Sequence, residues 1–577
     1  MARRITQPKK SRSQPPSVTP RLLPDPTPLL MASGPETAQV AAILEPYGIR
    51  AAKEADGNLQ SMAGDPHTRR QLADILPMLL ESIGRTADPD QALNHWERWF
   101  ASGLSRSAVL EYLRSSPRML DLVCAIFGNS DALAFTLIRD PLLVYWLAEQ
   151  DVLSKPSTRT AMERTIQQTL ARVSASELKL DTLRRFRRRE MLRIGVRDLL
   201  RLADVTETTA SLSDLASVLI DAAYRVVSSD LRAQYGVPMH KNRQGRWVET
   251  GFTVIGMGKL GGHELNYSSD VDVLYVCESH EGETHSIGGG RAKSRAGISN
   301  EEYFEILARQ VTKVLTEQTH EGYVYRVDLR LRAEGSVGQL TRSLDEYASY
   351  YRTRGQVWER LALLKAWPIA GSLEVGKQFV RMVRPFVLAS SGGKSATPNV
   401  QQCLAVVQDV RSVKERIDAK MADRGQERRN VKLGVGGIRE IEFLVQTIQV
   451  LAGRRLPALL DRSTLGSLVR LQEAGILSAK QQAQLTSAYN FLRDVEHKLQ
   501  MVHDLQTHAL PDQHDELERC SIRMGYNGEN RSAALKQFQI DHATHTAVVH
   551  HIFRLFFESP KISPVFRATL RATTARR

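Results

Sequence analysis

The stretch Gly-Met-Gly-Lys-Leu-Gly-Gly-His-Glu-Leu-Asn-Tyr-Ser-Ser-Asp-Val-Asp, at residues 256–272, joins a glycine-rich turn to two aspartates. The apolar residues 252–255 before it and 271–274 at its end predict two short buried strands. Glycines have no Cβ, so a backbone that runs through them can approach phosphate oxygens closely. We therefore predict a phosphate-binding turn, with Lys259 as a cation beside its glycines, Gly256, Gly258, Gly261 and Gly262.

The two aspartates at the end of this stretch are one residue apart. In a strand, side chains alternate between the two faces, so Asp270 and Asp272 share one face while Val271 and Val273 occupy the other. Two carboxylates this close repel each other unless a cation lies between them, and oxygen ligands of this kind suit Mg²⁺ held together with substrate phosphates. The spacing predicts a site for a metal-bound nucleotide.

A third acid comes from residues 324–332, Val-Tyr-Arg-Val-Asp-Leu-Arg-Leu-Arg, which alternate as a strand does. This pattern places Asp328 beside Arg330 and Arg332, with the apolar residues on the opposite face. Three aspartates with flanking arginines indicate a two-metal site for phosphoryl or nucleotidyl transfer. We expect Ser268 and Ser269 to orient the turn or a metal-bound water.

Each of these motifs alone also has an ordinary structural explanation. An isolated Asp-x-Asp is usually a solvated turn or a helix cap, and an isolated glycine turn is usually only a turn. Their combination with two predicted strands favours chemistry. The turn is not a P-loop, because Lys259 is not followed by Ser or Thr at the required spacing, and its acids come too soon for a dinucleotide-binding fingerprint.

The glycine turn followed by Asp-x-Asp resembles the nucleotidyltransferase superfamily that includes DNA polymerase beta, although Lys259 stands where many members carry Gly or Ser. The longer string Gly-Lys-Leu-Gly-Gly-x-Glu-Leu-Asn-x-Ser-Ser-Asp is similar to one family within it, the glutamine synthetase adenylyltransferase/adenylyl-removing enzymes. Further segments resemble that family in the same order, across roughly residues 110 to 555: residues 184–200, 326–340, 358–366, 430–443 and 493–511.

The resemblance implies an α-rich α+β fold, with a polymerase-beta-like nucleotidyltransferase core between flanking helical domains. It also implies control of nitrogen assimilation through AMP on a tyrosine of glutamine synthetase. The family carries two such units in tandem, whereas this chain has one. The motif sequences of this chain resemble the amino-terminal unit, which removes AMP by phosphorolysis to ADP. The sequence leaves open whether the chain is a natural single half or part of a split protein, and which direction of transfer prevails.

By the same resemblance, the site takes Mg²⁺ as cofactor, held by Asp270, Asp272 and Asp328. Lys259 and the turn would hold phosphate oxygens, and Arg330 and Arg332 would offset charge on the nucleotide or on incoming phosphate. The implied partners are glutamine synthetase, ATP or ADP, and phosphate, with a PII signalling protein as a further candidate. Nucleic acid is not an expected partner.

Two other functions fit parts of the sequence. A template-independent RNA or tRNA nucleotidyltransferase would use the same core, and the net charge of +14, concentrated in the tails, favours it weakly. A non-catalytic regulatory module that binds glutamine synthetase or PII is the second alternative. The intact Asp270, Asp272 and Asp328 speak against a catalytically silent module.

Composition indicates a large intracellular enzyme of several domains. The chain has 577 residues, of which 42% are hydrophobic. No run of 18 apolar residues predicts a membrane span, and no apolar core of a signal peptide follows the basic amino terminus. The four cysteines form neither a disulfide framework nor a metal-binding pattern. We therefore expect a cytoplasmic protein.

Stretches rich in Pro, Gly and Ser, together with hydrophobic periodicity, divide the chain into five parts. The expected parts are a disordered, basic, proline-rich tail (1–38), a helical region (39–204), the nucleotidyltransferase domain (205–395), a helical bundle (400–557) and a basic tail (558–577). Trp358 and Trp367 are predicted as core anchors, because they lie at helical spacing among leucines. By resemblance, the segment with Arg439, Glu440 and Glu442 approaches the site from the helical bundle; a helix cap with a salt bridge is the equally weighted alternative.

Overall fold

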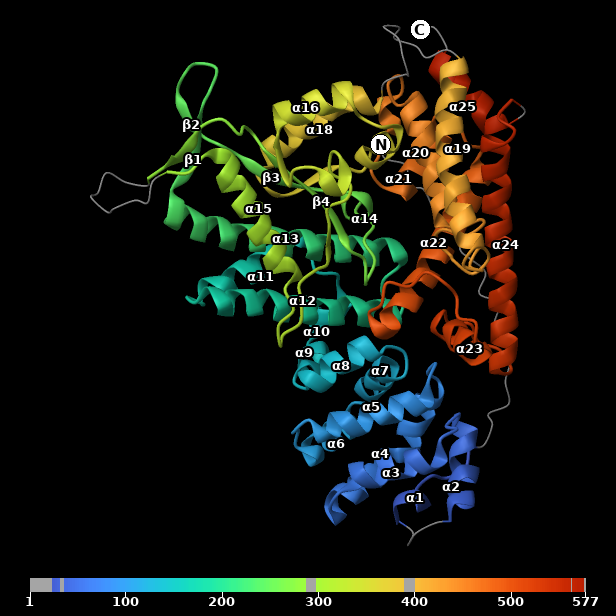
Figure 1. Ribbon diagram of the computed structural model, residues 1–577. Helices are drawn as coiled ribbons and strands as arrows, with labels where there is room; N and C mark the ends of the chain where they lie inside the picture. Colours follow the sequence, from blue (N-terminus) through green and yellow to red (C-terminus); the bar gives the residue numbers. More distant parts are fainter. Residues whose placement is uncertain (1–22, 32–35, 287–296, 389–399, 562, 575–577) are drawn as a thin grey trace, which may run out of the picture. The chain divides into compact units, whose positions relative to one another are not determined.

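A computed structural model describes residues 23–31, 36–286, 297–388, 400–561 and 563–574 (Figure 1). Its contacts group the chain into two compact units, one of residues 1–85 and 89–121 and one of residues 86–88 and 122–577. Every candidate site residue belongs to the second unit. Within the described ranges, each helix is too short or too polar to pass through a lipid bilayer.

The first unit is helical. Its core includes Trp96 and Trp99, both fully buried, and Asp65 caps α4 by accepting hydrogen bonds from the backbone N–H groups of His67 and Thr68. Its helices are α1 (Pro28–Met31), α2 (Thr37–Leu44), α3 (Ala52–Ala63), α4 (Pro66–Gly84), α5 (Pro89–Ala101) and α6 (Arg106–Ser115). The boundary between the units falls inside α7 (Pro117–Phe127). The predicted tail 1–38 lies partly outside the described residues, but its described part includes α1.

The second unit begins with further helices: α8 (Asp131–Arg139), α9 (Leu143–Ala148), α10 (Gln150–Ser154), α11 (Arg159–Ala171), α12 (Ser176–Leu199) and α13 (Val205–Tyr235). Asp204 begins α13 by accepting a hydrogen bond from the backbone N–H of Glu207. The described elements between residues 39 and 204 are thus helices. α12 and α13 pack together, and α13 also contacts the sheet that carries the site.

The sheet that carries the site has five strands, in the order β6-β4-β3-β8 with β7 also paired to β4. β3 (Phe252–Gly256) is antiparallel to β4 (Val271–Cys277) and to β8 (Trp367–Gly371). β6 (Val327–Asp328) and β7 (Thr341–Ser343) run parallel to β4. A separate antiparallel sheet contains β1 (Val237–Lys241), β2 (Trp247–Glu249) and β5 (Glu283–His285).

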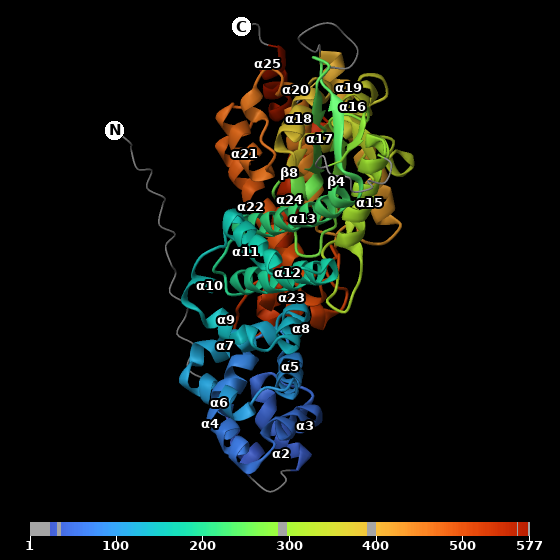
Figure 2. The ribbon, with the colours of Figure 1, turned by 90° about the vertical axis from the view of Figure 1, so that its left-hand side faces the viewer.

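Side chains of β4 alternate between two apolar cores. Val271, Val273 and Tyr275 pack with residues of α13 and α15 (Asn300–Thr316), whereas Leu274 and Val276 pack with α16 (Leu344–Thr353) and α18 (Leu373–Val387). The strands therefore lie between α18 on one face and α13 on the other, as two perpendicular views show (Figures 1 and 2). Asp272 lies two residues before Leu274, so its side chain is on the same face of β4, the face covered by α18. It stands at the beginning of the strand.

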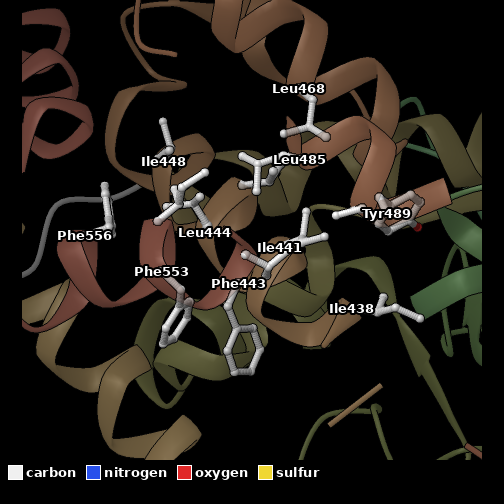
Figure 3. Packing of buried hydrophobic residues seen from close by; sticks show 14 of the residues in the cluster. Ile438, Ile441, Phe443, Leu444, Ile448, Leu468, Leu485, Tyr489, Phe553 and Phe556 are labelled. Atoms are coloured by element: carbon white, nitrogen blue, oxygen red, sulfur yellow. The ribbon is translucent and has the colours of Figure 1, made fainter. Parts of the chain in front are cut away.

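The remaining helices form a bundle around α20, whose apolar residues pack against several neighbours (Figure 3). Its central contacts include Ile441, Leu444 and Ile448. The helices after β7 that have not yet been placed are α17 (Val357–Leu363), α19 (Val400–Ala422), α20 (Ile438–Ala452), α21 (Thr464–Glu473), α22 (Ala479–His503), α23 (His514–Arg523), α24 (Arg531–Phe557) and α25 (Pro564–Thr574). The expected tail 558–577 contains α25, where Val565 and Phe566 are buried.

Candidate functional site

A cavity of about 550 Å³ lies where β4 and β6 face α17 and α20. The cavity carries acids, bases and an apolar wall: Gly258, Lys259, Ser269, Asp270, Asp272, Asp328, Arg330, Leu331, Trp358, Leu361, Ala362, Lys365, Val413, Lys432, Arg439, Glu442, Phe443, Gln446 and Gln506. All three predicted aspartates line it. Its size falls in the range of small-molecule sites in proteins.

Strand pairing brings two of the aspartates together. Asp272 on β4 is the register partner of Asp328 on β6, and Asp270 comes directly before β4. Burial and then the charge of Asp328 raise the pKa of Asp272 to about 6, against the attraction of Lys432. Among the described residues, the Asp272 carboxylate has no hydrogen-bond or ion-pair partner. It is therefore the acid in the cavity that most lacks a positive neighbour.

The other two aspartates are paired with arginines. Arg326 Nε lies 2.7 Å from Asp270 Oδ1, and an Arg330 guanidinium nitrogen lies 2.5 Å from Asp328 Oδ2. Hydrogen bonds from Arg330 lower the pKa of Asp328. As the side chains stand, no cluster of three or more possible ligands in the described ranges is arranged around a metal position.

The chemistry of these residues nevertheless fits a hard divalent cation. Carboxylate oxygens are the ligands that Mg²⁺ takes, and the unpaired, half-buried Asp272 is the register partner of Asp328. The side chain of Arg330 is 78% exposed, so it can leave Asp328 without moving the fold. A cation bound here would give the Asp272 carboxylate the positive partner that it lacks.

The glycine turn is a single helical turn, α14 (Gly258–Gly261), that follows β3. Gly258 has φ +52°, and a Cβ there would lie 2.4 Å from Asp272 Oδ2, so only glycine lets the turn lie against this carboxylate. The Met257 N–H donates to the Asp272 carbonyl at 2.8 Å. Gly258 lines the cavity, whereas Gly256, Gly261 and Gly262 are not among its lining residues.

Lys259 lines the cavity, but its ammonium is bound to a residue far along the chain. Lys259 Nζ lies 2.8 and 2.9 Å from the two carboxylate oxygens of Glu496 on α22. Burial lowers the pKa of Lys259 to about 7, while the charge of Glu496 opposes that shift. Glu496 is fully buried and is also 2.8 Å from His508 Nδ1. Lys259 therefore joins the turn to the helical bundle.

Two other predicted residues lie outside the cavity lining. Ser268 is buried, and its hydroxyl donates to Asp504 Oδ1 at 2.5 Å. Arg332 donates to the carbonyl oxygens of Leu329, Ser336 and Gly338 at 2.9, 2.7 and 3.0 Å. Arg332 thus braces the chain after β6. Ser269 does line the cavity.

The strand predicted over 324–332 is much shorter than expected. Only Val327–Asp328 pairs as a strand, because the chain turns after Asp328. The Arg330 N–H donates to Asp328 Oδ1 at 2.8 Å, and the Arg332 N–H donates to the Leu329 carbonyl at 3.2 Å. The alternating pattern was wrong for residues 329–332, since a side-chain carboxylate captured the backbone N–H that a longer strand would use.

The tryptophan prediction was also wrong. Trp358 is 40% exposed and lines the cavity, and Trp367 is 44% exposed with the Arg462 guanidinium 4.2 Å from its ring centre. Leucine neighbours at helical spacing indicated a buried face. α17 instead turns Trp358, Leu361 and Ala362 toward the cavity, a spacing of three and four residues that belongs to one face of a helix.

The sequence analysis named Arg439 and Glu442 by resemblance but missed the other residues that the helical bundle contributes to the cavity. Arg439, Glu442, Phe443 and Gln446 on α20 share one face and line the cavity. Their spacing was a usable signal, because a polar stripe interrupts an otherwise apolar helix. Lys432, from the turn before α20, also lines the cavity. Its ammonium forms no ion pair with any described residue.

The remaining polar residues of the glycine motif attach it to neighbouring helices. Lys365 Nζ donates to Glu264 Oε2 at 2.7 Å, and both side chains are buried. Arg493 on α22 donates to Asn266 Oδ1 and, at 2.7 Å, to the Glu264 carbonyl. The Tyr267 hydroxyl donates to Asp198 on α12 at 2.9 Å. Lys365 lines the cavity, whereas Arg493 and Asp198 hold the motif from outside it.

Two stretches of the chain match models of known protein families. Residues 120–382 match the family described as glutamate-ammonia ligase adenylyltransferase. Residues 411–557 match the family described as GlnD PII-uridylyltransferase. The first match contains β3, β4 and β6 with the three aspartates, and the second contains α20 and α22.

Several curated relatives are bifunctional glutamine synthetase adenylyltransferase/adenylyl-removing enzymes. Those of Hahella chejuensis and Nitrosococcus oceani are each 35% identical to this chain, over 70% and 77% of it. That of Streptomyces coelicolor is 32% identical over 85% of it. The alignments cover 39%, 43% and 45% of these relatives, so the chain spans less than half of their length.

The family matches agree with the geometry, since the matched region carries paired acidic strands, a glycine turn and an adjoining helical bundle around one cavity. The chain belongs to the glutamate-ammonia ligase adenylyltransferase family of nucleotidyltransferases and corresponds to one half of its bifunctional enzymes.

Proposed function

We propose that this chain removes AMP from a modified tyrosine of glutamine synthetase, with inorganic phosphate as the acceptor. The observation that supports this most directly is the pair Asp272 and Asp328, register partners on two neighbouring strands, in a cavity that Lys432 and Arg439 also line. The acids suit a metal-bound phosphoryl group, and the cations suit an incoming anion.

The reaction is a displacement at the phosphorus of AMP. An oxygen of phosphate forms a new bond to that phosphorus as the bond to the tyrosyl oxygen breaks. The tyrosyl oxygen leaves with the bonding electrons and takes up the proton that the attacking phosphate gives up. ADP and unmodified tyrosine result, and no redox change occurs.

Asp270, Asp272 and Asp328 would hold Mg²⁺, which when bound stabilises negative charge on the phosphate oxygens. Lys432 is the cation best placed for the phosphate acceptor, because its ammonium has no ion pair with a described residue. Arg439 is already 3.3 Å from Glu442, and Lys259 is held by Glu496. Gly258 lets the turn lie against Asp272 beside the transferred group.

The sequences of the glycine motif and of residues 437–443 support removal of AMP over addition of AMP from ATP. Names of the relatives support glutamine synthetase as the protein substrate. A PII signalling protein is proposed as a regulatory partner, on the resemblance alone.

The test is an assay on both forms of glutamine synthetase. Purified chain, Mg²⁺, phosphate and AMP-modified enzyme should yield ADP and the unmodified tyrosine, measured by chromatography and mass spectrometry. Omission of phosphate should stop the reaction, and Asp272→Asn should abolish it. AMP addition from ATP without removal would reverse the assigned direction. Extension of RNA with neither reaction would support the polymerase alternative instead.

A further inference from the structure

The cavity has a second half that the phosphate chemistry leaves unused. Its wall consists of apolar side chains from three helices: Trp358, Leu361 and Ala362 of α17, Val413 of α19 and Phe443 of α20. The three aspartates line the same cavity. An AMP group has a charged phosphate and a flat, largely apolar base, so a cavity with both kinds of lining suits both parts of the group.

Trp358 is the unusual member of this wall. Its side chain is 40% exposed, although it sits beside Leu361, which is buried. No ring stacks on it and no cation lies over it among the described residues. Burial of an exposed tryptophan face against a flat ring is favourable, by about 1–3 kcal/mol for base–aromatic stacking.

Gln446 is the one neutral polar side chain of α20 in the cavity lining. It is only 7% exposed, yet its amide makes no hydrogen bond with any described residue. Amides inside proteins are normally hydrogen-bonded, so one that lines a cavity without a protein partner is open to a polar group of a ligand. The contrast is Gln449, one turn later, whose amide donates to Leu459 O, Asp461 O and Ser467 Oγ at 2.7, 2.8 and 2.9 Å.

We infer that this half of the cavity is a nucleobase subsite, in which the base packs against Trp358 and pairs with the amide of Gln446. The amide offers one acceptor and two donors, which match the amino group of adenine and the ring nitrogen beside it. The assignment rests on the proposed function for the phosphate half of the cavity. The subsite adds to that function two residues that would select the base, Trp358 and Gln446.

The first experiment uses nucleotide binding alone, with no protein substrate. MgADP should change the tryptophan emission of the full chain, and Trp358→Phe should remove most of that change although the other five tryptophans remain. Magnesium pyrophosphate, which has no base, should bind without this signal. An equal signal from both ligands, or a signal that survives in Trp358→Phe, would overturn the assignment of Trp358.

The second experiment compares two matched variants by calorimetric titration. Gln446→Leu should weaken MgADP binding about tenfold and leave pyrophosphate binding unchanged, because only the base loses its partner. Gln449→Leu should lower thermal stability but leave both affinities unchanged. Equal weakening of both ligands by Gln446→Leu, or no weakening of either, would refute the role of Gln446.

Folding and function are separable in this design. If Gln446→Leu does not fold, Trp358→Leu at the exposed position decides, and it should also weaken MgADP about tenfold while pyrophosphate binding persists. AMP removal that proceeds normally, with base-independent binding, would overturn the subsite and leave the proposed function standing. Base-dependent ADP binding without AMP removal would support the subsite and overturn the proposed function.

Discussion

Removal of the Glu264 carboxylate should weaken the attachment of the glycine turn to the helical bundle. Glu264 and Lys365 have side chains only 6% and 7% exposed, with 2.7 Å between the carboxylate and the ammonium. Glu264 also accepts hydrogen bonds from the backbone N–H and the hydroxyl of Thr464. In Glu264→Ala, Lys365 keeps Glu442 at 3.5 Å as its charged partner and the Thr464 hydroxyl at 3.4 Å.

The magnitude follows from leaving a buried charge without its partner. Breaking a buried ion pair costs about 3–5 kcal/mol, and Glu442 offsets part of this loss. The unpaired N–H of Thr464 costs about 1–3 kcal/mol. We expect a total loss of about 3–5 kcal/mol in the free energy of unfolding. For a cooperative unit of roughly 450 residues, this lowers the melting temperature by about 3–5 °C.

Scanning calorimetry measures the change in melting temperature, and two further variants serve as controls. Glu374→Ala breaks an exposed pair with Arg381, whose side chains are 64% and 66% exposed, and should cost at most about 1 kcal/mol. Glu264→Leu combined with Lys365→Met removes both charges and should recover most of the loss, since an apolar pair leaves no uncompensated ion. A Glu264→Ala protein that melts within about 1 °C of the parent would refute the reasoning.

Four further predictions concern the cavity. Asp272→Asn and Asp328→Asn should each keep the circular dichroism of the parent but lose about a thousandfold or more of Mg²⁺-dependent AMP removal, because the carboxylates would hold the metal. Parental rates in either variant would contradict its assignment. Gly258→Ala should lower activity at least about tenfold and stability by about 1–2 kcal/mol, because its Cβ meets Asp272 at a φ of +52°. Lys432→Ala should raise the KM for phosphate about tenfold with a smaller effect on kcat; an unchanged KM would exclude it from phosphate binding. Burial disfavours the charged form of Glu442, but the positive charges of Lys365 and Arg439 outweigh burial and lower the pKa of Glu442 to about 2. Its stabilising contribution is complete above the unfolded value near 4.5 and is lost as pH falls toward 2, so Glu442→Gln should show a weaker dependence of melting temperature on pH between 5 and 2.

Local patterns in the sequence predicted the strands of the site well. The period of two correctly placed Val271 and Val273 opposite Asp272, because each face of β4 is buried against helices. The period failed at Leu329, where a carboxylate bonds the backbone and ends the strand. Such competition depends on one side-chain rotamer, which hydrophobic periodicity does not encode.

Contacts across long sequence separations were beyond prediction. Lys259 was expected at a phosphate, and its partner Glu496 lies 237 positions away on α22. Lys432 and Gln446 line the cavity together with residues of α17, which packs against α20. The polar stripe on α20 and the family resemblance of the segment around Arg439 were the signals for this part of the site. The exposure of Trp358 follows from the rotation of α17, which its leucine neighbours alone did not fix.

The bond between Lys259 and Glu496 also has an evolutionary consequence. A neutral residue in place of Glu496 would leave the Lys259 ammonium without its partner, whereas Glu496 also pairs with His508 and Arg493. A neutral residue at position 496 should therefore occur only together with a neutral residue at position 259. Divergence of the catalytic turn is in this way tied to divergence of a helix from another part of the chain, and the two regions are expected to have been inherited together.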